Sequence, residues 1–273
     1  MTTPGELWLR EYHDRKPDSQ SVLIEAGRVV GDGRTSYDVF AERVGKARRV
    51  VDLGCGDGAL LATFARQGTE SLAGIDLSAG ELELAAQRPE LRAAQLKQGR
   101  AQELPFADKT FDAVVSHMTL MLMADLEQVV AEAARVLAPR GVFAAVVGGG
   151  GAVGATGVFF ELAKPRFDAV PEERKPPIDG DRRTRSAEGF DEFLAPVGFE
   201  PVAWEQIVVD FAAPPEQVWV TCCETLYPAS TLDDVQLAEL RAEFSEATRG
   251  LLTADGILPA AVRLNIARTR LAE

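Results

Sequence analysis

The sequence predicts an α/β protein in which helices cover a mostly parallel β-sheet. Over the first 150 residues, short apolar runs typical of strands alternate with helical segments, as in sheets whose parallel strands are joined by crossover helices. The run GVFAAVV at residues 141–147 is apolar throughout, as expected for a central strand buried on both faces. With 46% hydrophobic and 26% charged residues, the chain can bury a sizeable core.

The expected elements of this first part follow one another closely, and several carry recognisable end signals. Gly68 lies where glycine commonly ends a helix, Ser78 with Glu81 forms a capping box, and Asp125 with Gln128 marks another helix start. In chain order we expect strand, helix, strand, helix, strand, strand, helix and strand at residues 49–53, 58–67, 71–76, 78–88, 95–99, 111–116, 125–137 and 141–147.

The regular alternation breaks after the glycine run at residues 148–151, which we interpret as a hinge. Residues 153–185, with Phe159 and Phe160 in an apolar helical stretch, are expected to form a lid that closes over the site. Further elements are expected at residues 186–195, 199–211, 214–226, 233–250 and 260–270, as helix, strand, two helices and a final strand. We therefore expect a single domain over residues 1–273, made of a helical cap (1–48), a core (49–150), and lid insertions with the remaining strands (151–273).

Composition and charge exclude several classes of function. The 29 basic and 42 acidic residues give a net charge of −13, so we expect neither DNA nor RNA as a partner. Cys55, Cys222 and Cys223 show no disulfide framework and no metal-ligand spacing, and we expect no metal site. No apolar run is long enough to span a membrane and the N-terminal stretch is charged, so we expect a cytoplasmic protein without membrane association.

The segment VVDLGCGDG at residues 50–58 predicts a strand, a glycine-rich turn and a helix, where missing Cβ atoms let the backbone approach a nucleotide-like ligand. The spacing G-x-G-x-x-A from Gly54, with Asp76 further on, also satisfies the dinucleotide fingerprint, so NAD is an alternative ligand. A tight turn that binds no ligand is a second alternative. Asp52 favours a cationic ligand, because its carboxylate would repel a pyrophosphate on the helix N-terminus. The sulfonium and ammonium groups of S-adenosylmethionine (SAM) meet that requirement.

Three motifs in order, VVDLGCGDG, GIDLS and GRAQELPFADKTFDAVVS, resemble the motif series of class I SAM-dependent methyltransferases, specifically the small-molecule branch. The resemblance covers about residues 49–150. It implies SAM as cofactor and a Rossmann-like, doubly wound, seven-stranded sheet, mostly parallel with an antiparallel last strand, plus helical lid insertions. It also implies contacts from Gly54, Cys55 and Gly56 to the ribose and methionine of SAM, from Asp76 to both ribose hydroxyls and from Leu77 to the adenine.

The segment expected at the adenine departs from the pattern of that family. Family members commonly read Gly-Asp-Ala-Glu before Leu-Pro-Phe, with the acid contacting the adenine amino group, whereas this chain has Arg100 at the position of the acid. A guanidinium has donors only and cannot accept from that amino group. Ala101 and Gln102 can still supply the expected backbone contact, and either Gln102 or backbone carbonyls would accept from the amino group.

Two histidines are the candidate catalytic residues. Ser116 and His117 leave the carboxyl end of the fourth expected strand, where ligands bind in open α/β sheets, so both are expected to line the cofactor site. For His117, acid/base work and structural packing remain alternatives, since many relatives carry their histidine a few residues later, where this chain has Met121. His13 lies in a region that often folds over the substrate in this family, and it is either a second acid/base candidate or a solvated side chain.

The resulting prediction is a SAM-dependent methyltransferase that moves a methyl group to an O, N or C atom of a small organic acceptor, with specialised metabolites among the candidates. Such a reaction is an in-line displacement, so the protein must mainly hold the reacting groups aligned in a dry pocket. A SAM-binding protein that does not transfer methyl, such as a cyclase or regulatory binder, is the alternative. An NAD-linked oxidoreductase is a lesser one, and the oligomeric state is not predicted.

Overall fold

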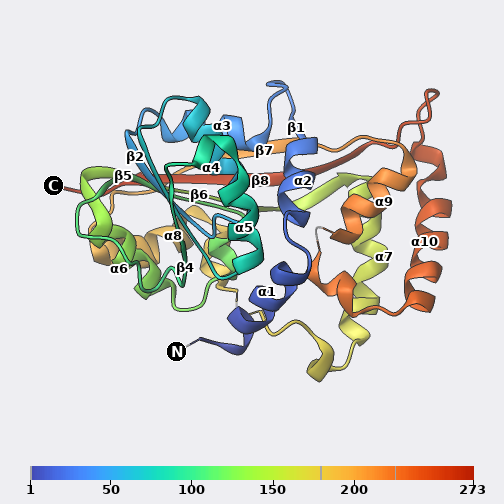
Figure 1. Ribbon diagram of the computed structural model, residues 1–273. Coiled ribbons are helices and arrows are strands. Elements are labelled where there is room, and N and C mark those ends of the chain that lie inside the picture. Colours follow the sequence, from blue (N-terminus) through green and yellow to red (C-terminus); the bar gives the residue numbers. More distant parts are fainter. Residues whose placement is uncertain (1, 179, 225) are drawn as a thin grey trace.

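The computed structural model describes residues 2–178, 180–224 and 226–273. These residues contain one eight-stranded sheet in the order β1-β7-β8-β6-β5-β2-β3-β4 (Figure 1). The strands are β1 (Arg28–Val29), β2 (Arg49–Leu53), β3 (Ser71–Asp76), β4 (Gln95–Gln98), β5 (Phe111–His117), β6 (Leu137–Gly154), β7 (Ala203–Asp210) and β8 (Ala260–Arg270).

Helices lie on both faces of the sheet and beyond one of its ends (Figure 1). The α-helices are α1 (Pro4–Arg15), α2 (Ser19–Ala26), α3 (Ser36–Val44), α4 (Ala59–Arg66), α5 (Ala79–Gln87), α6 (Leu126–Val136), α7 (Ala155–Ala169), α8 (Ala187–Leu194), α9 (Pro215–Glu224) and α10 (Asp234–Thr248). Short 3₁₀ turns connect them at η1 (Pro89–Leu91), η2 (Leu120–Leu122), η3 (Glu172–Arg174), η4 (Arg182–Arg185), η5 (Ala195–Val197), η6 (Tyr227–Thr231) and η7 (Arg249–Leu251). None of the helices in the described residues is both long and apolar enough to cross a lipid bilayer.

The sheet confirms the predicted mostly parallel architecture but has one strand more than expected. Strands β6, β5, β2, β3 and β4 are parallel to one another, while β8 is antiparallel to both β6 and β7. The additional strand is β1, which pairs antiparallel with the end of β7 through Arg28↔Asp210 and Val29↔Val209. The prediction of seven strands is therefore wrong at this edge, because residues 28–29, within the expected helical cap, form a strand. A two-residue strand leaves no periodicity in the sequence.

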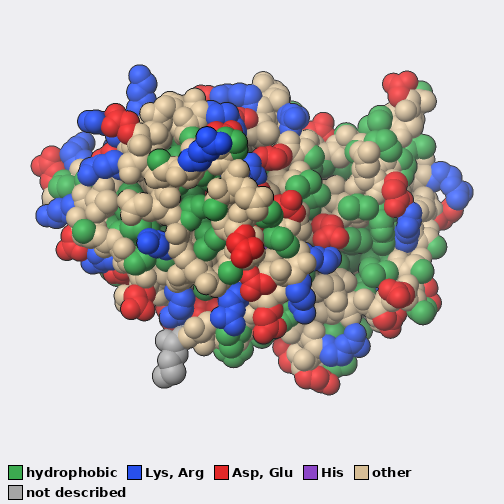
Figure 2. Space-filling model, in the orientation of Figure 1, with side chains coloured by type: hydrophobic (Ala, Val, Ile, Leu, Met, Phe, Trp, Pro, Cys, Tyr) green, Lys and Arg blue, Asp and Glu red, His purple; other side chains and the backbone are tan. Residues whose placement is uncertain are grey.

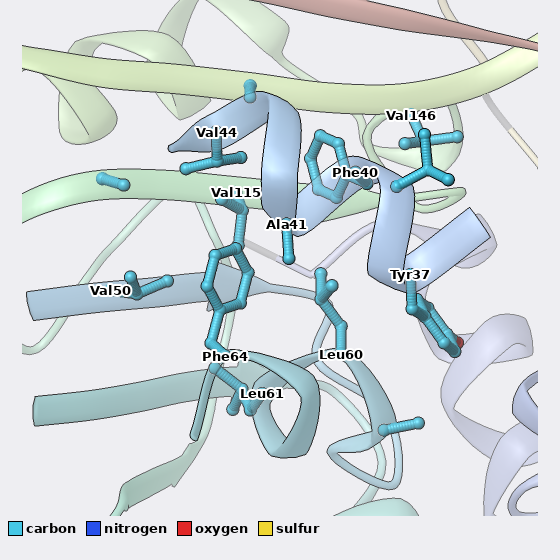
Figure 3. Close-up of a cluster of buried hydrophobic side chains, with 14 of the residues drawn as sticks. Tyr37, Phe40, Ala41, Val44, Val50, Leu60, Leu61, Phe64, Val115 and Val146 are labelled. Atoms are coloured by element: carbon cyan, nitrogen blue, oxygen red, sulfur yellow. The ribbon is translucent and has the colours of Figure 1, made fainter. Parts of the chain in front are cut away.

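The central strands direct alternate side chains into two separate cores, as the two-residue period of a strand requires. Val50, Val115 and Val146 point to the face covered by α3 and α4 (Figure 3), where Phe40 and Phe64 are fully buried. Their sequence neighbours Val51, Val114 and Val147 pack instead against α6 and α8 on the other face. Because both faces are buried, these strands read as continuous apolar runs, and this explains why their positions were predictable.

A third core lies between α7, α9 and α10, at one side of the molecule (Figure 1). Phe159 is completely buried there, with ring centroids 5.6 Å from Trp219 and 6.0 Å from Phe244. Phe160 is 41% exposed. The glycine run does not release the chain either, because β6 continues through it and pairs with β8 again after a register shift between Gly148 and Ala152. The predicted hinge is therefore wrong, because the glycine run is part of β6. The predicted lid face is wrong as well, because Phe159 is buried in the third core while Phe160 is exposed.

Candidate functional site

A cavity lies at the carboxyl ends of β2, β3 and β5, where parallel α/β sheets bind their ligands. Its floor is the glycine-rich turn after β2, and its cover comes from α1, α2 and η6. In Figure 1, α1 and α2 run across this edge of the sheet, between the sheet and the third core. Ten of the predicted site residues line the wall: His13, Gly54, Cys55, Gly56, Asp76, Leu77, Arg100, Ala101, Gln102 and His117.

The glycine-rich turn has a backbone that only glycine adopts easily. Gly54 and Gly56 have φ values of 73° and 51°. A Cβ atom at Gly54 would come within 2.2 Å of Thr119 Cγ2, so the space above this residue is already taken. The N–H groups of Gly54 and Cys55 both donate to the Ile75 carbonyl, at 2.8 and 3.1 Å, which fixes the turn against β3.

Asp76 is the last residue of β3, beside the glycine-rich turn, and two backbone N–H groups hold its carboxylate. Its Oδ2 accepts from the Gly56 N–H at 2.8 Å and its Oδ1 from the Ser78 N–H at 2.9 Å. Burial raises the pKa of this carboxyl, and the two backbone hydrogen bonds partly oppose that effect. A carboxylate has about four acceptor positions, so each oxygen can still accept from a ligand hydroxyl.

Two of the predicted residues lie behind the wall instead of on it. The Ser116 hydroxyl is fully buried and donates to the Leu53 carbonyl at 3.0 Å, which links β5 to β2. Asp52 is 2% exposed at the end of β2, and its Oδ1 has no hydrogen-bond partner. Desolvation, and then the nearby charge of Asp76, raise the pKa of Asp52 well above its ordinary value. A cation bound close to this acid would stabilise its ionised form.

Arg100, which stands where the family carries an acid, holds the first helix instead. Its Nε and Nη2 donate to the Glu6 carboxylate on α1 at 2.9 and 2.8 Å, and Gln102 Nε2 donates to the same carboxylate at 3.0 Å. Gln102 Nε2 also reaches the Ala124 carbonyl at 2.7 Å. Glu6 was not predicted, and the structure also places it in a capping box with Thr3 at the start of α1.

His117 is a neutral side chain in the wall of the cavity. Its Nε2 is 3.1 Å from the Ser36 hydroxyl, while its Nδ1 is buried without a partner. The ring packs against Tyr37 with centroids 4.6 Å apart. Burial lowers the pKa of His117 to about 3, so the imidazole carries no charge at neutral pH.

His13 belongs to a chain of three hydrogen-bonded side chains on the cavity wall. Its Nδ1 is 2.9 Å from Glu81 Oε1, and its Nε2 is 3.0 Å from the Tyr227 hydroxyl. The other oxygen of Glu81 accepts from the Asp18 N–H at 3.1 Å. Glu81 and Tyr227 were not predicted. Glu81 was read as part of a capping box, and Tyr227 is separated from His13 by 214 positions.

The described residues offer no arrangement for a metal ion, since no three His, Cys, Asp or Glu side chains among them converge. On the face shown in Figure 2, acidic and basic side chains are interspersed. Cys55 is buried, and burial holds the pKa of its thiol well above the ordinary range. A raised pKa disfavours the thiolate, and Cys55 packs in the core beneath the turn.

Comparisons with known proteins agree with this geometry. Residues 51–145 match the family model described as a methyltransferase domain. A fatty-acid O-methyltransferase of Mycolicibacterium smegmatis is 31% identical over 128 residues, which cover 46% of this chain and 41% of that enzyme. The chain thus spans less than half the length of this relative.

Two solved structures show the same fold over nearly the whole chain. Phosphoethanolamine N-methyltransferase 2 of Haemonchus contortus, in complex with S-adenosyl-L-methionine, has a TM-score of 0.57 and 17% identity, covering 97% of this chain and 60% of that one. The [4+2]-cyclase SpnF has a TM-score of 0.56 and 20% identity, covering 97% and 96%. Residues 51–145 are thus similar to a methyltransferase domain, and the two solved structures share the fold of this chain.

Proposed function

We propose that the protein transfers the methyl group of SAM to an O, N or C atom of a small organic acceptor. The observation that carries this proposal is Asp52, a buried acid whose Oδ1 has no partner and which lies two positions before the glycine-rich turn. The sulfonium and ammonium groups of SAM would compensate this charge, whereas the pyrophosphate of NAD would add to it. The same residue therefore argues against the oxidoreductase alternative.

The remaining wall residues suit the other parts of SAM. In this proposal Gly54, Cys55 and Gly56 pass beneath the ribose and methionine, and Asp76 accepts from both ribose hydroxyls with the acceptor positions that its two backbone donors leave free. Leu77 packs on the adenine. Bound SAM supplies an activated methyl group on a positively charged sulfur, and the protein supplies alignment and a dry environment.

Arg100 receives a different role from the acid that it replaces. Its ion pair with Glu6 ties α1 over the adenine end of the cavity, and Gln102 contributes to the same link. The backbone N–H groups of Ala101 and Gln102 remain the proposed contacts to the adenine ring. His117 is proposed to line the cofactor site as a neutral hydrogen-bonding group, because a pKa of about 3 makes it a poor general base at neutral pH.

A small acceptor fits both the cavity and the charge of the molecule. Apolar side chains form much of the wall, and a net charge of −13 opposes nucleic acid as substrate. The relative named above is a fatty-acid O-methyltransferase, and we extend only the class of small organic acceptors to this chain. We further propose that residues 1–273 act as one methyltransferase domain and that the protein is cytoplasmic, which suits a sequence whose three cysteines show no disulfide framework.

Thermal melting with added ligands tests the proposal. SAM and S-adenosylhomocysteine should raise the melting midpoint and NAD should not, since a ligand at about 100 times its Kd stabilises the fold by about 2.7 kcal/mol. Asp76→Ala should weaken SAM binding measured by calorimetry by about 1.5 to 3 kcal/mol, because it removes charge-assisted hydrogen bonds to the ribose. A midpoint raised by NAD alone would contradict the proposal. SAM binding without S-adenosylhomocysteine formation from any acceptor would favour the non-transferring alternative.

A further inference from the structure

Glu81, His13 and Tyr227 come from three distant segments, α5, α1 and η6, and meet on the wall of the cavity. The Glu81 side chain is 6% exposed and that of His13 is 19% exposed. Both oxygens of Glu81 are engaged, one by His13 and one by the Asp18 N–H. The carboxylate is therefore fixed in place, and it fixes the ring of His13.

Donor and acceptor chemistry indicates the direction of the hydrogen bonds among these three side chains. A carboxylate only accepts, so His13 carries its proton on Nδ1 and donates it to Glu81. When the ring is neutral, its Nε2 is an acceptor, and the Tyr227 hydroxyl then donates to it. The Tyr227 oxygen keeps its lone pairs for a ligand in the cavity, because its proton points toward His13.

The other titratable groups on the wall are poorly placed to take a proton. Asp76 is reserved for the ribose in the proposed function. Four more are excluded by an existing ion pair or by burial: Glu6 (paired with Arg100), Asp57 (paired with Arg88), His117 (pKa lowered to about 3) and Cys55 (a thiol that burial keeps protonated). His13, which is oriented by a carboxylate and faces a hydroxyl, is left as the proton acceptor.

We propose that Tyr227, His13 and Glu81 form a proton relay that deprotonates the acceptor, and that the acceptor is an aromatic hydroxyl compound. This inference rests on the proposed methyl transfer and names its substrate class. Tyr227 is the catalytic residue that touches the acceptor hydroxyl, His13 receives the proton, and Glu81 is a positioning residue that also stabilises the imidazolium.

The step balances without any further reactant. The acceptor oxygen forms the new O–CH₃ bond while the S–CH₃ bond of SAM breaks, and the bonding pair stays on the sulfur of S-adenosylhomocysteine. The acceptor proton passes to the Tyr227 oxygen as the proton of Tyr227 passes to His13 Nε2. Since the His13 side chain is partly exposed, the imidazolium can then release this proton to water.

The apolar wall and the strength of the base both favour an aromatic hydroxyl. The chain has four methionines, and three of them line the cavity beside Leu9, Ile24 and Leu122: Met118, Met121 and Met123. Thioether sulfurs make favourable contacts with aromatic rings and adapt to irregular shapes. A phenolic hydroxyl, with a pKa of about 10, is also acidic enough for a histidine to take its proton, unlike a water-like hydroxyl near 16.

Methylation of phenols that differ in acidity tests the relay. The probes are 4-nitrophenol and unsubstituted phenol, with S-adenosylhomocysteine formation as the readout, in the wild type, Tyr227→Phe, His13→Gln and Glu81→Gln. With phenol, Tyr227→Phe and His13→Gln should each lose about 100-fold in kcat, the lower range for general base catalysis. With 4-nitrophenol at about pH 9, where it is already an anion, the loss should stay within about threefold.

Tyr12→Phe is the matched control. Tyr12 packs edge-on against Tyr227, with ring centroids 5.1 Å apart, but does not line the cavity, so both rates should stay at wild-type level. Glu81→Gln should lose less than His13→Gln, because a glutamine oxygen still accepts from Nδ1–H but cannot stabilise an imidazolium.

Two outcomes would overturn the inference. Equal losses with both phenols in Tyr227→Phe and His13→Gln would show that the pair only positions the substrate, so no relay operates. A wild-type protein that methylates neither phenol would remove the acceptor class. Calorimetry with SAM separates these cases from failure of the proposed function, since only the latter abolishes SAM binding in the wild type; melting midpoints confirm that each variant is folded.

Discussion

Replacing Phe159 by alanine should destabilise the fold strongly and leave cofactor binding intact. The ring is fully buried between Trp219 and Phe244, so its removal leaves a cavity in the third core. Buried Phe→Ala substitutions cost about 3 to 5 kcal/mol. For a chain of this size, about 2 to 4 °C per kcal/mol converts that cost to a fall of roughly 6 to 20 °C in the melting midpoint.

Phe160 provides a matched control in the adjacent position. Its side chain is 41% exposed, so Phe160→Ala should cost about 1 kcal/mol or less. Calorimetric melting of both variants, with SAM titrations below the transition, measures stability and affinity separately. Similar midpoints for the two variants would refute the assignment of Phe159 to a structural core. A loss of SAM affinity in folded Phe159→Ala as large as that in Asp76→Ala would show that α7 reaches the cofactor after all.

The glycine-rich turn and the buried acid beneath it lead to two further predictions. Gly54→Ala should abolish SAM binding and destabilise the fold by more than Gly68→Ala does. Both glycines have positive φ values, but of the two only Gly54 would clash with a neighbour, Thr119, if it carried a Cβ atom. The melting midpoints of the two variants measure this difference. Asp52, whose pKa is raised by desolvation, binds its proton more tightly in the folded state than in the unfolded state. The ligand-free protein should therefore lose stability as the pH rises above about 4, and SAM should stabilise it more at higher pH. Both slopes should flatten in Asp52→Asn, and parallel pH profiles of the two proteins would argue against an ionised Asp52 beneath the cofactor.

The parts of the fold that were predictable are those whose signal is local. Strands β2, β3 and β8 begin and end at the predicted residues, because apolar runs bounded by glycine or polar residues define them. The Ser78 side chain caps α5 as expected, but Glu81 does not complete the predicted capping box, because its two oxygens contact His13 and the Asp18 N–H. Asp125 shows the limit of such reasoning, since it precedes α6 in a left-handed conformation with φ 51° and its side chain makes no capping hydrogen bond. The sequence shows that an aspartate can cap a helix, but the backbone conformation at that residue decides whether its side chain reaches the first N–H groups.

The parts that could not be predicted depend on contacts between distant segments. The glycine run at residues 148–151 resembles a hinge in isolation, yet pairing with β8 extends β6 through it. Arg100 reads as a lost adenine contact until Glu6, 94 positions away, is placed beside it. In the same way His13 has no distinguishing neighbour in sequence, and its partners Glu81 and Tyr227 appear only when α1 docks on the core. Candidate cofactor residues were thus readable from the motifs, whereas the residues of the cover were not.

The cover is linked chemically to the cofactor motifs. Three side chains of α1 reach the core: Glu6 contacts Arg100 and Gln102, His13 contacts Glu81, and Asp14 contacts Ser78 and Gly80. Their partners are the segment after β4 and the start of α5, which immediately follows Asp76. Besides these polar contacts, α1 buries the apolar side chains of Leu9 and Tyr12, and Trp8 packs on Tyr12 and Tyr227. The first helix is therefore positioned over the cavity by polar contacts to the core as well as by apolar packing.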